Sequence, residues 1–241
     1  DLPLEEVALL LSDYQLYPLF VDPADCGHAG IRRTRVYVYC VHNETGVYLY
    51  DLYEMYASIT KLIKRTDYFV ATKLAQQVHA RSICEMRGFE FDPDRPVDSM
   101  FNSRERSVIA ELNEAYLERT GGNPPEKNKN LVYFLGDNPK WAKTWSAASH
   151  KLPTFRRNGG FYYSPATARV MLPTDKLAAL GWPTNLQAAR GMGTKKFPAM
   201  DRRRGDLVAG NAMHLGNSTI LLLLGLVCFG HQDDALQFDD L

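Results

Sequence analysis

An α/β fold is predicted from three features of this sequence. Residues 35–41 (Arg-Val-Tyr-Val-Tyr-Cys-Val) are mostly β-branched or aromatic, which is typical of a strand. Several segments between residues 53 and 119 carry apolar side chains at helical spacing, and residues 219–229 form a dense apolar run that fits a buried helix. With 241 residues, 45% of them hydrophobic, the chain can bury the core of one large domain or two small ones.

The first 45 residues predict a helix, a strand, a loop and a strand, in that order. Pro3 with acidic residues soon after it is typical of a helix start, and apolar side chains continue at helical spacing as far as Tyr14. Residues 17–21 form a short apolar strand, and residues 22–30 are rich in Asp, Gly and Pro, as loops are. We expect residues 35–41 to be a strand buried on both faces of a mixed sheet.

The next segment, residues 46–150, is expected to be a largely helical insert. Ser103 is suited to cap a helix that Gly121-Gly122 would end. A strand is expected over residues 131–135, followed by a turn at residues 136–139. The helices predicted in this segment cover residues 53–64, 68–86 and 104–119.

Three segments occur in an order that resembles the C-terminal end of DNA cytosine-5 methyltransferases. Near the start, Gly30-Ile-Arg-Arg-Thr-Arg-Val-Tyr-Val38 is similar to that family's "G-x-P-Q-x-R-x-R-[VL]-[FY]" strand. Leu152-Pro-Thr154 leads to Arg169-Val-Met-Leu-Pro-Thr-Asp-Lys-Leu-Ala-Ala-Leu-Gly-Trp-Pro183, which is similar to the family's "R-x-L-T-x-x-E-x-x-x-L-Q-G-[FW]-P" helix. Gly210-Asn-Ala-Met-His214 then matches "G-N-[AS]-x-P" in its first three residues. The resemblance covers roughly residues 9–42 and 150–229.

The resemblance implies the C-terminal part of a methyltransferase-type mixed sheet with a largely helical inserted recognition region. Residues 1–45 would end the catalytic α/β domain, residues 46–150 would take the place of the variable target-recognition region, and residues 151–241 would return to the catalytic domain. The implied activity is transfer of a methyl group from S-adenosylmethionine to cytosine C5 in DNA. DNA is therefore the expected partner, and the expected compartment is the nucleus or another reducing compartment that contains DNA.

Several motifs of that family do not occur in this sequence. The Phe-x-Gly-x-Gly methyl-donor loop, the Pro-Cys dipeptide with the attacking thiolate and the Glu-Asn-Val acid are missing, and the four cysteines follow Asp, Tyr, Ile and Val. The chain also begins at Asp1, in sequence that is typical of a helix. We therefore expect a C-terminal portion that is inactive alone and works with an upstream catalytic half in the same or another chain.

The resemblance also implies roles for individual residues. It assigns Arg33 and Arg35 to contacts with the flipped target cytosine and its neighbouring phosphate, which planar guanidinium donors suit. It assigns Asn211 and Ala212 to the methyl donor, because the family's Gly-Asn turn begins the last helix and free N–H groups at a helix start attract a carboxylate. Thr174 is expected to cap the helix of residues 175–180. The alternatives are a solvated basic strand entry and an Asn-capped packing helix.

Basic residues are clustered, although 28 Lys+Arg balance 28 Asp+Glu over the whole chain. Such clusters can hold a phosphate backbone, and the alternative for each is a solvated surface. The predicted DNA contacts are Arg32, Arg156, Arg157, Arg202, Arg203 and Arg204. The cysteines lack C-x-x-C spacing, so no metal site is predicted. We expect Cys40 and Cys228 to be buried thiols in a reducing compartment.

Two other classes of protein are alternatives. One is a non-enzymatic remnant of the family that binds DNA or a partner protein. The other is a membrane-associated protein, because residues 207–229 contain no Asp, Glu, Lys or Arg. The dense apolar run covers only residues 219–229, which is shorter than the roughly 20 residues that a spanning helix needs, so no membrane partner is expected.

Overall fold

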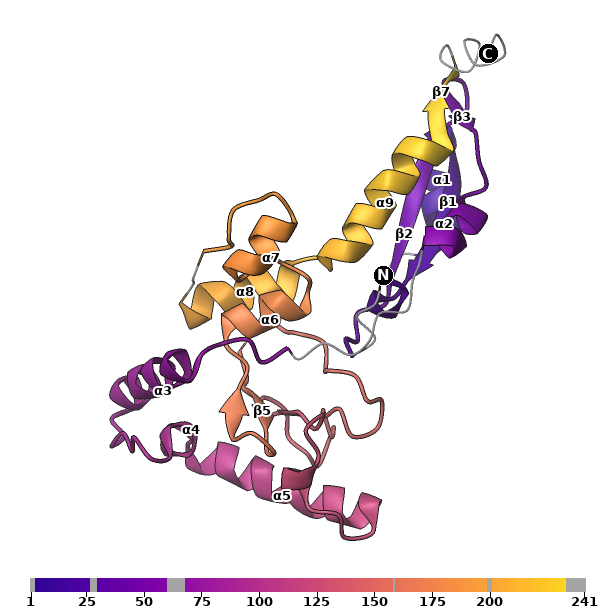
Figure 1. The fold of residues 1–241 in the computed structure, drawn as a ribbon. Coiled ribbons are helices and arrows are strands. Elements are labelled where there is room, and N and C mark those ends of the chain that lie inside the picture. Colours follow the sequence, from indigo (N-terminus) through magenta and orange to yellow (C-terminus); the bar gives the residue numbers. More distant parts are fainter. Residues whose placement is uncertain (1–2, 27–29, 60–67, 158, 199–200, 233–241) are drawn as a thin grey trace. The chain divides into compact units, whose positions relative to one another are not determined.

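The chain forms mixed α/β structure in which every described sheet is small and antiparallel (Figure 1). A computed structural model describes residues 3–26, 30–59, 68–157, 159–198 and 201–232. Within these ranges the strands form three sheets, β1–β2, β3–β7 and β4–β5–β6. The predicted α/β class is confirmed at this level. The mixed sheet expected around residues 35–41 is not formed by the described residues, whose strands all pair in antiparallel fashion.

The chain divides into two compact units. Unit 1 joins residues 1–29, 33–64 and 213–241, and unit 2 consists of residues 30–32 and 65–212. The predicted segments ended at residues 45 and 150, whereas residues 46–59 lie in unit 1 and residues 151–212 in unit 2. The chain therefore begins in unit 1, builds unit 2 and returns to unit 1 for its last helix.

Unit 1 is a β-hairpin with helices and a second pair of short strands. The elements are α1 (Leu4–Leu10), β1 (Tyr14–Val21), η1 (Pro23–Cys26), β2 (Arg35–His42), β3 (Gly46–Tyr48), α2 (Leu52–Ile59), α9 (Leu215–Cys228) and β7 (Phe229–His231). Residues 60–64 of the helix predicted over 53–64 lie outside the described residues.

The core of unit 1 lies between the β1–β2 hairpin and α9. Leu19 and Val21 from β1 pack with Leu221 and Leu224 from α9, and all four are buried. The hydroxyl of Tyr39 on β2 donates a hydrogen bond of 2.6 Å to the carbonyl oxygen of Leu221. Cys228 is also buried in this cluster, as predicted.

The other face of the hairpin is apolar and exposed. Alternate residues of β1 lie opposite alternate residues of β2, in the pairs Leu16 with Cys40, Pro18 with Val38 and Phe20 with Val36. Phe20 is 64% exposed and Val36 is 46% exposed. The predictions that β2 is buried on both faces and that Cys40 is buried are therefore wrong. Because side chains alternate along a strand, Tyr39 faces α9 and Cys40 faces away from it.

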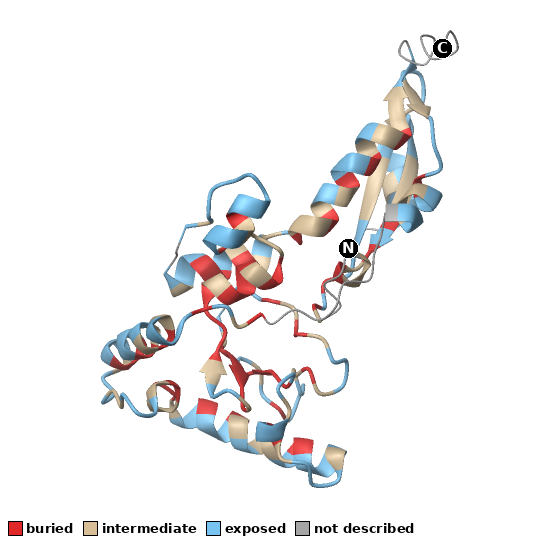
Figure 2. Cartoon of the chain, in the orientation of Figure 1, coloured by how far each residue is buried: buried red, intermediate tan, exposed pale blue. Residues whose placement is uncertain are grey.

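The outer side of α9 is also rich in exposed leucines. Leu222 is 71% exposed and Leu226 is 81% exposed, while Leu221 and Leu224 on the same helix pack with the hairpin and are buried. Figure 2 shows buried and exposed positions along this helix. Unit 1 therefore has two layers, the hairpin and α9, and exposed apolar side chains lie on the outer face of each. Domains bury such faces against a further layer.

Unit 2 is mostly helical, with one small sheet at its centre. Its elements are α3 (Lys73–Arg87), α4 (Pro96–Ser99), α5 (Ser103–Thr120), η2 (Pro125–Lys127), β4 (Tyr133–Phe134), β5 (Tyr162–Ser164), β6 (Arg169–Val170), α6 (Pro173–Ala179), α7 (Leu186–Gly191) and α8 (Arg202–Asn211). One apolar cluster joins α3, α4 and α5 to the sheet, and a second joins the sheet to α6 and α8.

The helix ends of unit 2 differ in detail from those predicted. Helix α5 is capped by Asn102 rather than Ser103, since the Asn102 side chain accepts the Glu105 N–H, and Gly121 ends the helix with φ 66° as expected. Helix α6 begins at Pro173, and the Asp175 side chain accepts the Leu172 N–H at 2.9 Å. Thr174 is therefore not the cap, because it already lies inside the first turn.

Candidate nucleic-acid interface

The two arginines predicted on the β2 strand have different environments. Arg33, just before the strand, is 7% exposed, and burial lowers the pKa of its guanidinium, with the charge of Arg35 acting in the same direction. Arg35 is exposed, and its Nη1 donates to the carbonyl oxygen of Thr34 at 2.8 Å. Arg32 is exposed and belongs to unit 2. Arg35 and Arg32 are thus accessible to a ligand, whereas Arg33 is largely buried.

Asn211 and Ala212 do not begin the last helix. Asn211 is the final residue of α8, its Nδ2 donates to the Leu207 carbonyl oxygen at 2.9 Å, and Ala212 is the C-cap. Helix α9 begins at Leu215 instead, after the N-cap His214, whose Nδ1 accepts the Asn217 N–H. The expected helix N-terminus at Asn211 is wrong: the carbonyl end of a helix repels a carboxylate that the opposite end would attract. Arg33 and Arg35 belong to unit 1 and Asn211 to unit 2, so their expected proximity stays a prediction.

Arg156 and Arg157 are neighbours with different roles. Arg156 makes two hydrogen bonds to the Asp137 carboxylate, of 2.7 and 2.9 Å, and its guanidinium lies 5.0 Å from the centre of the Phe134 ring. Arg157 is exposed and has no ion-pair partner among the described residues. Its backbone packs against Gly210 of α8, where an added Cβ would lie 2.6 Å from the Arg157 nitrogen. The charge of Arg157 is therefore the one available to a ligand.

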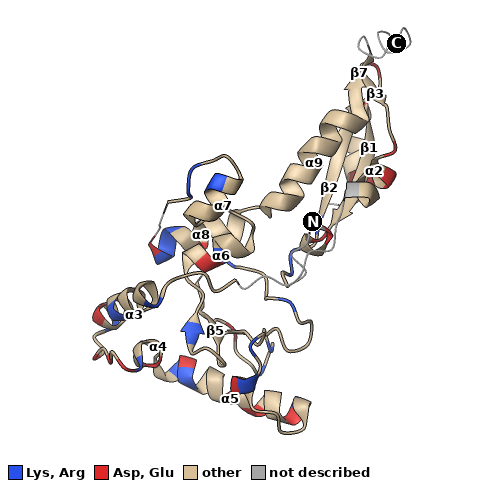
Figure 3. Ribbon diagram, in the orientation of Figure 1, with Lys and Arg blue, Asp and Glu red and all other residues tan. Residues whose placement is uncertain are grey.

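The three arginines at the start of α8 also differ. Arg202 lies 3.9 Å from the centre of the Phe161 ring and 3.6 Å from the Asp206 carboxylate, and it donates to the Gly159 carbonyl oxygen. Arg203 is exposed and has no ion-pair partner in the described part of the chain. Arg204 pairs with Asp201 at 3.4 Å, and both side chains are exposed. Charged residues of α8 are coloured in Figure 3.

A cavity of about 770 Å³ lies between α3 and α8, and we call it the α3–α8 groove. Val78, His79 and Met86 line it from α3, and Arg202 and Arg203 line it from α8. The groove is further lined by Ala75, Ser82, Ile83, Arg157, Gly159, Leu172, Pro173, Thr174, Asp201 and Asp206. The α3 wall is therefore mainly apolar, and the α8 wall carries arginines together with two aspartates.

A buried network of charges lies behind the α8 wall. The ammonium group of Lys176 forms an ion pair with the Asp206 carboxylate, and the side chains of both are 4% exposed. Arg202 pairs with the same carboxylate through its Nε atom. Burial lowers the pKa values of both Lys176 and Arg202, and Asp206 acts in the opposite direction. Lys176 and Arg202 thus share the Asp206 carboxylate, and the neighbouring Asp175 carboxyl also acts on Lys176.

His79 lies beside this network and lines the groove. Burial lowers the pKa of its imidazole to about 4, and the positive charges of Arg202 and Lys176 act in the same direction. The imidazole is therefore neutral near pH 7, where it can donate one hydrogen bond and accept another. It adds polarity to the groove without adding charge.

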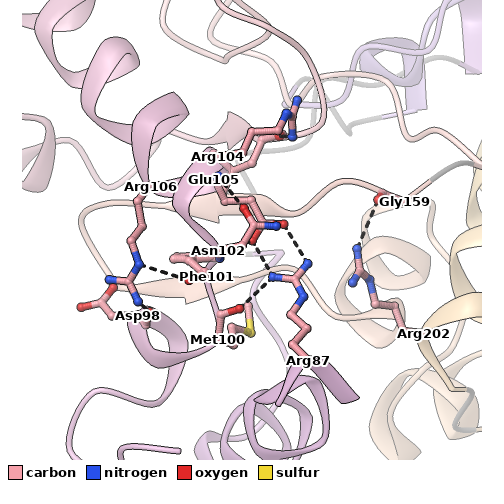
Figure 4. Close-up of polar contacts among 11 residues, drawn as sticks. Arg87, Asp98, Met100, Phe101, Asn102, Arg104, Glu105, Arg106, Gly159 and Arg202 are labelled. Carbon is pink, nitrogen blue, oxygen red and sulfur yellow. Dashed lines mark hydrogen bonds and ion pairs between the residues drawn. The ribbon is translucent and has the colours of Figure 1, made fainter. Parts of the chain in front are cut away.

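A second recess, of about 570 Å³, shares Arg157 and Gly159 with the α3–α8 groove. Arg104 lines it and donates to the carbonyl oxygens of Leu135, Gly136 and Asp137. The neighbouring Arg87 is paired with Glu105 through two hydrogen bonds, and Figure 4 shows Arg202 reaching Gly159 close to this pair. Together the linings of the two recesses hold five arginines and four acidic residues.

Sequence reasoning missed several residues of this site. His79, Lys176 and Asp206 were not singled out, because an isolated histidine and a lysine inside an apolar helix carry no motif. The one signal was the position of Lys176, which lies between apolar residues on the buried face of α6. A charge on such a face needs a partner, and the sequence did not indicate that Asp206, 30 residues later, supplies it.

Comparison of the chain with protein-family models and with curated proteins found no match to either. No group of three or more His, Cys, Asp or Glu residues is placed to hold a metal ion within the described ranges. One helical stretch, Arg202–Cys228, is long and apolar enough to cross a membrane by length and composition, with 28% of its most apolar window buried. The core helix of a soluble protein can have the same length and composition, so this stretch is weak evidence for a membrane span.

Proposed function

We propose that this chain is the C-terminal portion of a DNA (cytosine-5)-methyltransferase-like protein. The whole protein would transfer methyl from S-adenosylmethionine to cytosine C5 in DNA, and this chain would supply DNA contacts to an upstream catalytic half. The observation that carries the proposal is the path of the chain. Helix α9 packs on the hairpin that contains Arg35, although the residues between them build unit 2. A recognition region inserted into a catalytic domain requires such a return.

The exposed apolar faces of unit 1 support the proposal that an upstream half packs against it. Phe20 and Val36 on the hairpin and Leu226 on α9 are exposed apolar side chains on opposite sides of the unit. An α/β sheet normally carries a layer on each face, and this hairpin has one layer among the described residues. The proposal assigns the missing layer to the catalytic half, in the same chain or another.

The arginines of unit 2 support contact with DNA. Within the described ranges Arg157 and Arg203 have no ion-pair partner, and both line one groove. Arg204 has a surface partner that a phosphate can replace. Guanidinium groups bind phosphate through paired hydrogen bonds, and phosphate contacts provide most of the non-specific affinity for DNA. Arg202 and Arg156 would act indirectly, because their guanidiniums are already held by Asp206 and Asp137.

The described residues do not fit S-adenosylmethionine at the predicted position. The argument for Asn211 and Ala212 required a helix N-terminus there, and α8 ends at Asn211. The proposal therefore places the methyl donor on the upstream half. Cys40, Cys84 and Cys228 are free thiols, which supports a nuclear or other reducing compartment.

The position of Asn211 favours a second candidate function. A non-enzymatic remnant that binds DNA needs no contact with S-adenosylmethionine, and the arginines of unit 2 would be sufficient for its function. The upstream coding sequence separates the two candidates. A Phe-x-Gly-x-Gly loop and a Pro-Cys dipeptide in frame before Asp1 would support the enzyme, and a start codon directly before Asp1 would support the remnant.

Transfer of tritiated methyl from S-adenosylmethionine to DNA tests whether catalysis requires the upstream half in addition to this chain. The chain alone should show background activity, because it has no positioned thiolate to attack cytosine C6. Mixed with the upstream half, it should give product that is lost when the thiolate cysteine of that half is replaced. Activity of the chain alone would overturn the proposal.

Duplex binding tests the DNA contacts. The chain should bind a fluorescent duplex weakly, with a dissociation constant on the order of 10⁻⁴–10⁻⁶ M and a steep dependence on salt. Replacing Arg203 and Arg204 with serine should weaken binding and flatten the salt slope. The matched control replaces Arg119 and Arg190, which are exposed arginines elsewhere in unit 2, and should bind like the wild type. Absence of duplex binding at low salt would remove the DNA proposal.

A further inference from the structure

The α3–α8 groove combines two features that do not follow from binding a duplex surface. Its α8 wall carries Arg157 and Arg203, which have no ion-pair partner among the described residues, and behind them lies the network in which Lys176 and Arg202 share the Asp206 carboxylate. Its other wall is aliphatic. A DNA backbone needs only the first feature, whereas a nucleotide unit that enters a cavity can use both.

The charge of the network points to an anionic ligand. Buried cations are normally matched by acids, and here one carboxylate serves two cations. Asp175 is a further acid in this region, and burial raises the pKa of its carboxyl to about 6 while the charge of Arg169 acts in the opposite direction. Asp201 lines the groove but already pairs with Arg204. An anion bound in the groove would give the arginines that line it a further acceptor.

The aliphatic wall points to an apolar or flat group attached to that anion. Val78 is 61% exposed and Met86 is 70% exposed, and both face the groove from α3. Pro173 and Leu172 continue the wall at the start of α6. Methionine makes favourable contacts with aromatic rings, and a volume of about 770 Å³ lies within the range of roughly 300–1,000 Å³ for ligand pockets.

We propose that the α3–α8 groove binds a single nucleotide unit, with the phosphate on Arg157 and Arg203 and the nucleoside against Val78 and Met86. Arg157 and Arg203 offer forked N–H donors, which match the geometry of phosphate oxygens. The neutral imidazole of His79 lies on the same side of α3 and can donate or accept a hydrogen bond to the sugar or base. This inference does not depend on the methyltransferase assignment.

Calorimetric titration of the full chain with three probes tests the proposal. The nucleotide dCMP should bind more tightly than inorganic phosphate or deoxycytidine, by about tenfold or more in each case. Replacing Arg157 and Arg203 with glutamine should weaken dCMP binding by a similar factor. Met86→Ser should weaken dCMP binding and leave phosphate binding unchanged, because it removes the apolar contact without adding a charge. The control Arg119→Gln should change neither.

The same variants separate this inference from the proposed function. Equal affinity of the wild type and the Arg157→Gln/Arg203→Gln variant for dCMP, or no dCMP binding at millimolar concentration, would overturn the nucleotide site whether or not duplex DNA binds. Binding of dCMP without duplex binding would support the site and remove the DNA proposal. Titration with a short single-stranded oligonucleotide identifies the source of the nucleotide. Tighter binding than dCMP through the same arginines would show that the nucleotide belongs to a strand, and equal binding would show that it is free.

Discussion

At the scale of single residues, Asp206 is the group on which the charges of unit 2 depend. Its carboxylate is the acceptor for the buried Lys176 and for Arg202. Removing one partner of a buried ion pair lowers the free energy of unfolding by more than the intact pair contributes to it, because the remaining charge is buried without a partner. The same substitution in an exposed pair costs little.

We therefore expect Asp206→Asn to lower the free energy of unfolding by about 3–5 kcal/mol. Asp98→Asn is the matched control, because Asp98 pairs with Arg95 at 2.9 Å with side chains 32% and 72% exposed. That control should cost about 1 kcal/mol or less. Urea unfolding followed by circular dichroism measures both values, and equal values for the two variants would contradict the role given to Asp206.

His79 should make unit 2 sensitive to acid. The pKa of its imidazole is lowered from 6.5 to about 4 by burial first and by the charges of Arg202 and Lys176. Below the unfolded pKa the unfolded chain takes up a proton that the folded chain refuses, so stability falls as the pH drops from about 6.5 to about 4. Between pH 7 and pH 5 this contribution should amount to about 2 kcal/mol.

The variant His79→Gln should lose that part of the pH dependence. Unfolding in urea at pH 7 and at pH 5 gives the two differences to compare, and the carboxylates of the chain contribute equally to both proteins. A wild type and a variant that lose the same stability between these pH values would show that His79 titrates normally.

At the scale of elements, α6 and α8 approach each other because glycine lies at their contact. A Cβ added to Gly205 of α8 would lie 2.2 Å from the Cβ of Pro173, which begins α6. Gly191 at the end of α7 has no neighbour within 4 Å of such an atom. We expect Gly205→Ala to lower the melting temperature, with a loss of about 1–3 kcal/mol, and Gly191→Ala to leave it unchanged or raise it slightly.

Thermal unfolding of both variants provides the measurement. A Gly205→Ala protein as stable as the wild type would mean that α8 can move away from Pro173 at no cost. The prediction matters for function, since a displaced α8 would also move Arg202 and Arg203 away from the groove.

The elements show which kinds of structure this sequence predicts. Helix α5 was predicted almost to the residue, because its cap, its apolar spacing and its terminal glycine are all local. Helix α3 begins at Lys73 rather than at residue 68, because Thr72 caps it and Tyr68 and Ala71 pack against other parts of unit 2. The basic clusters were predicted, but their division into paired and free arginines was not. That division depends on Asp137 and Asp206, which tertiary folding brings to them.

At the scale of the whole molecule, unit 1 exposes apolar side chains on both outer faces. Phe20 is 64% exposed and Leu226 is 81% exposed. We expect the isolated chain to self-associate as its concentration rises, because exposed apolar patches drive association. The double variant Phe20→Lys/Leu226→Lys should associate less, with a stability within about 0.5 kcal/mol of the wild type.

Sedimentation velocity over a range of concentrations measures that association. Leu186→Lys is the control, because Leu186 is 62% exposed on α7 of unit 2 and should not contribute. If the control lowers association as much as the double variant does, the relevant patch lies on unit 2 instead.

The return of α9 to the hairpin has a consequence for synthesis on the ribosome. The hairpin is made first, yet the helix that covers its inner face emerges only after all of unit 2 has been translated. At about 5–20 residues per second, the interval is on the order of ten seconds. Unit 2 can therefore fold before Leu19 and Val21 contact Leu221 and Leu224, so the core of unit 1 is completed only after unit 2 has been made. During that interval the nascent hairpin is a natural substrate for chaperones.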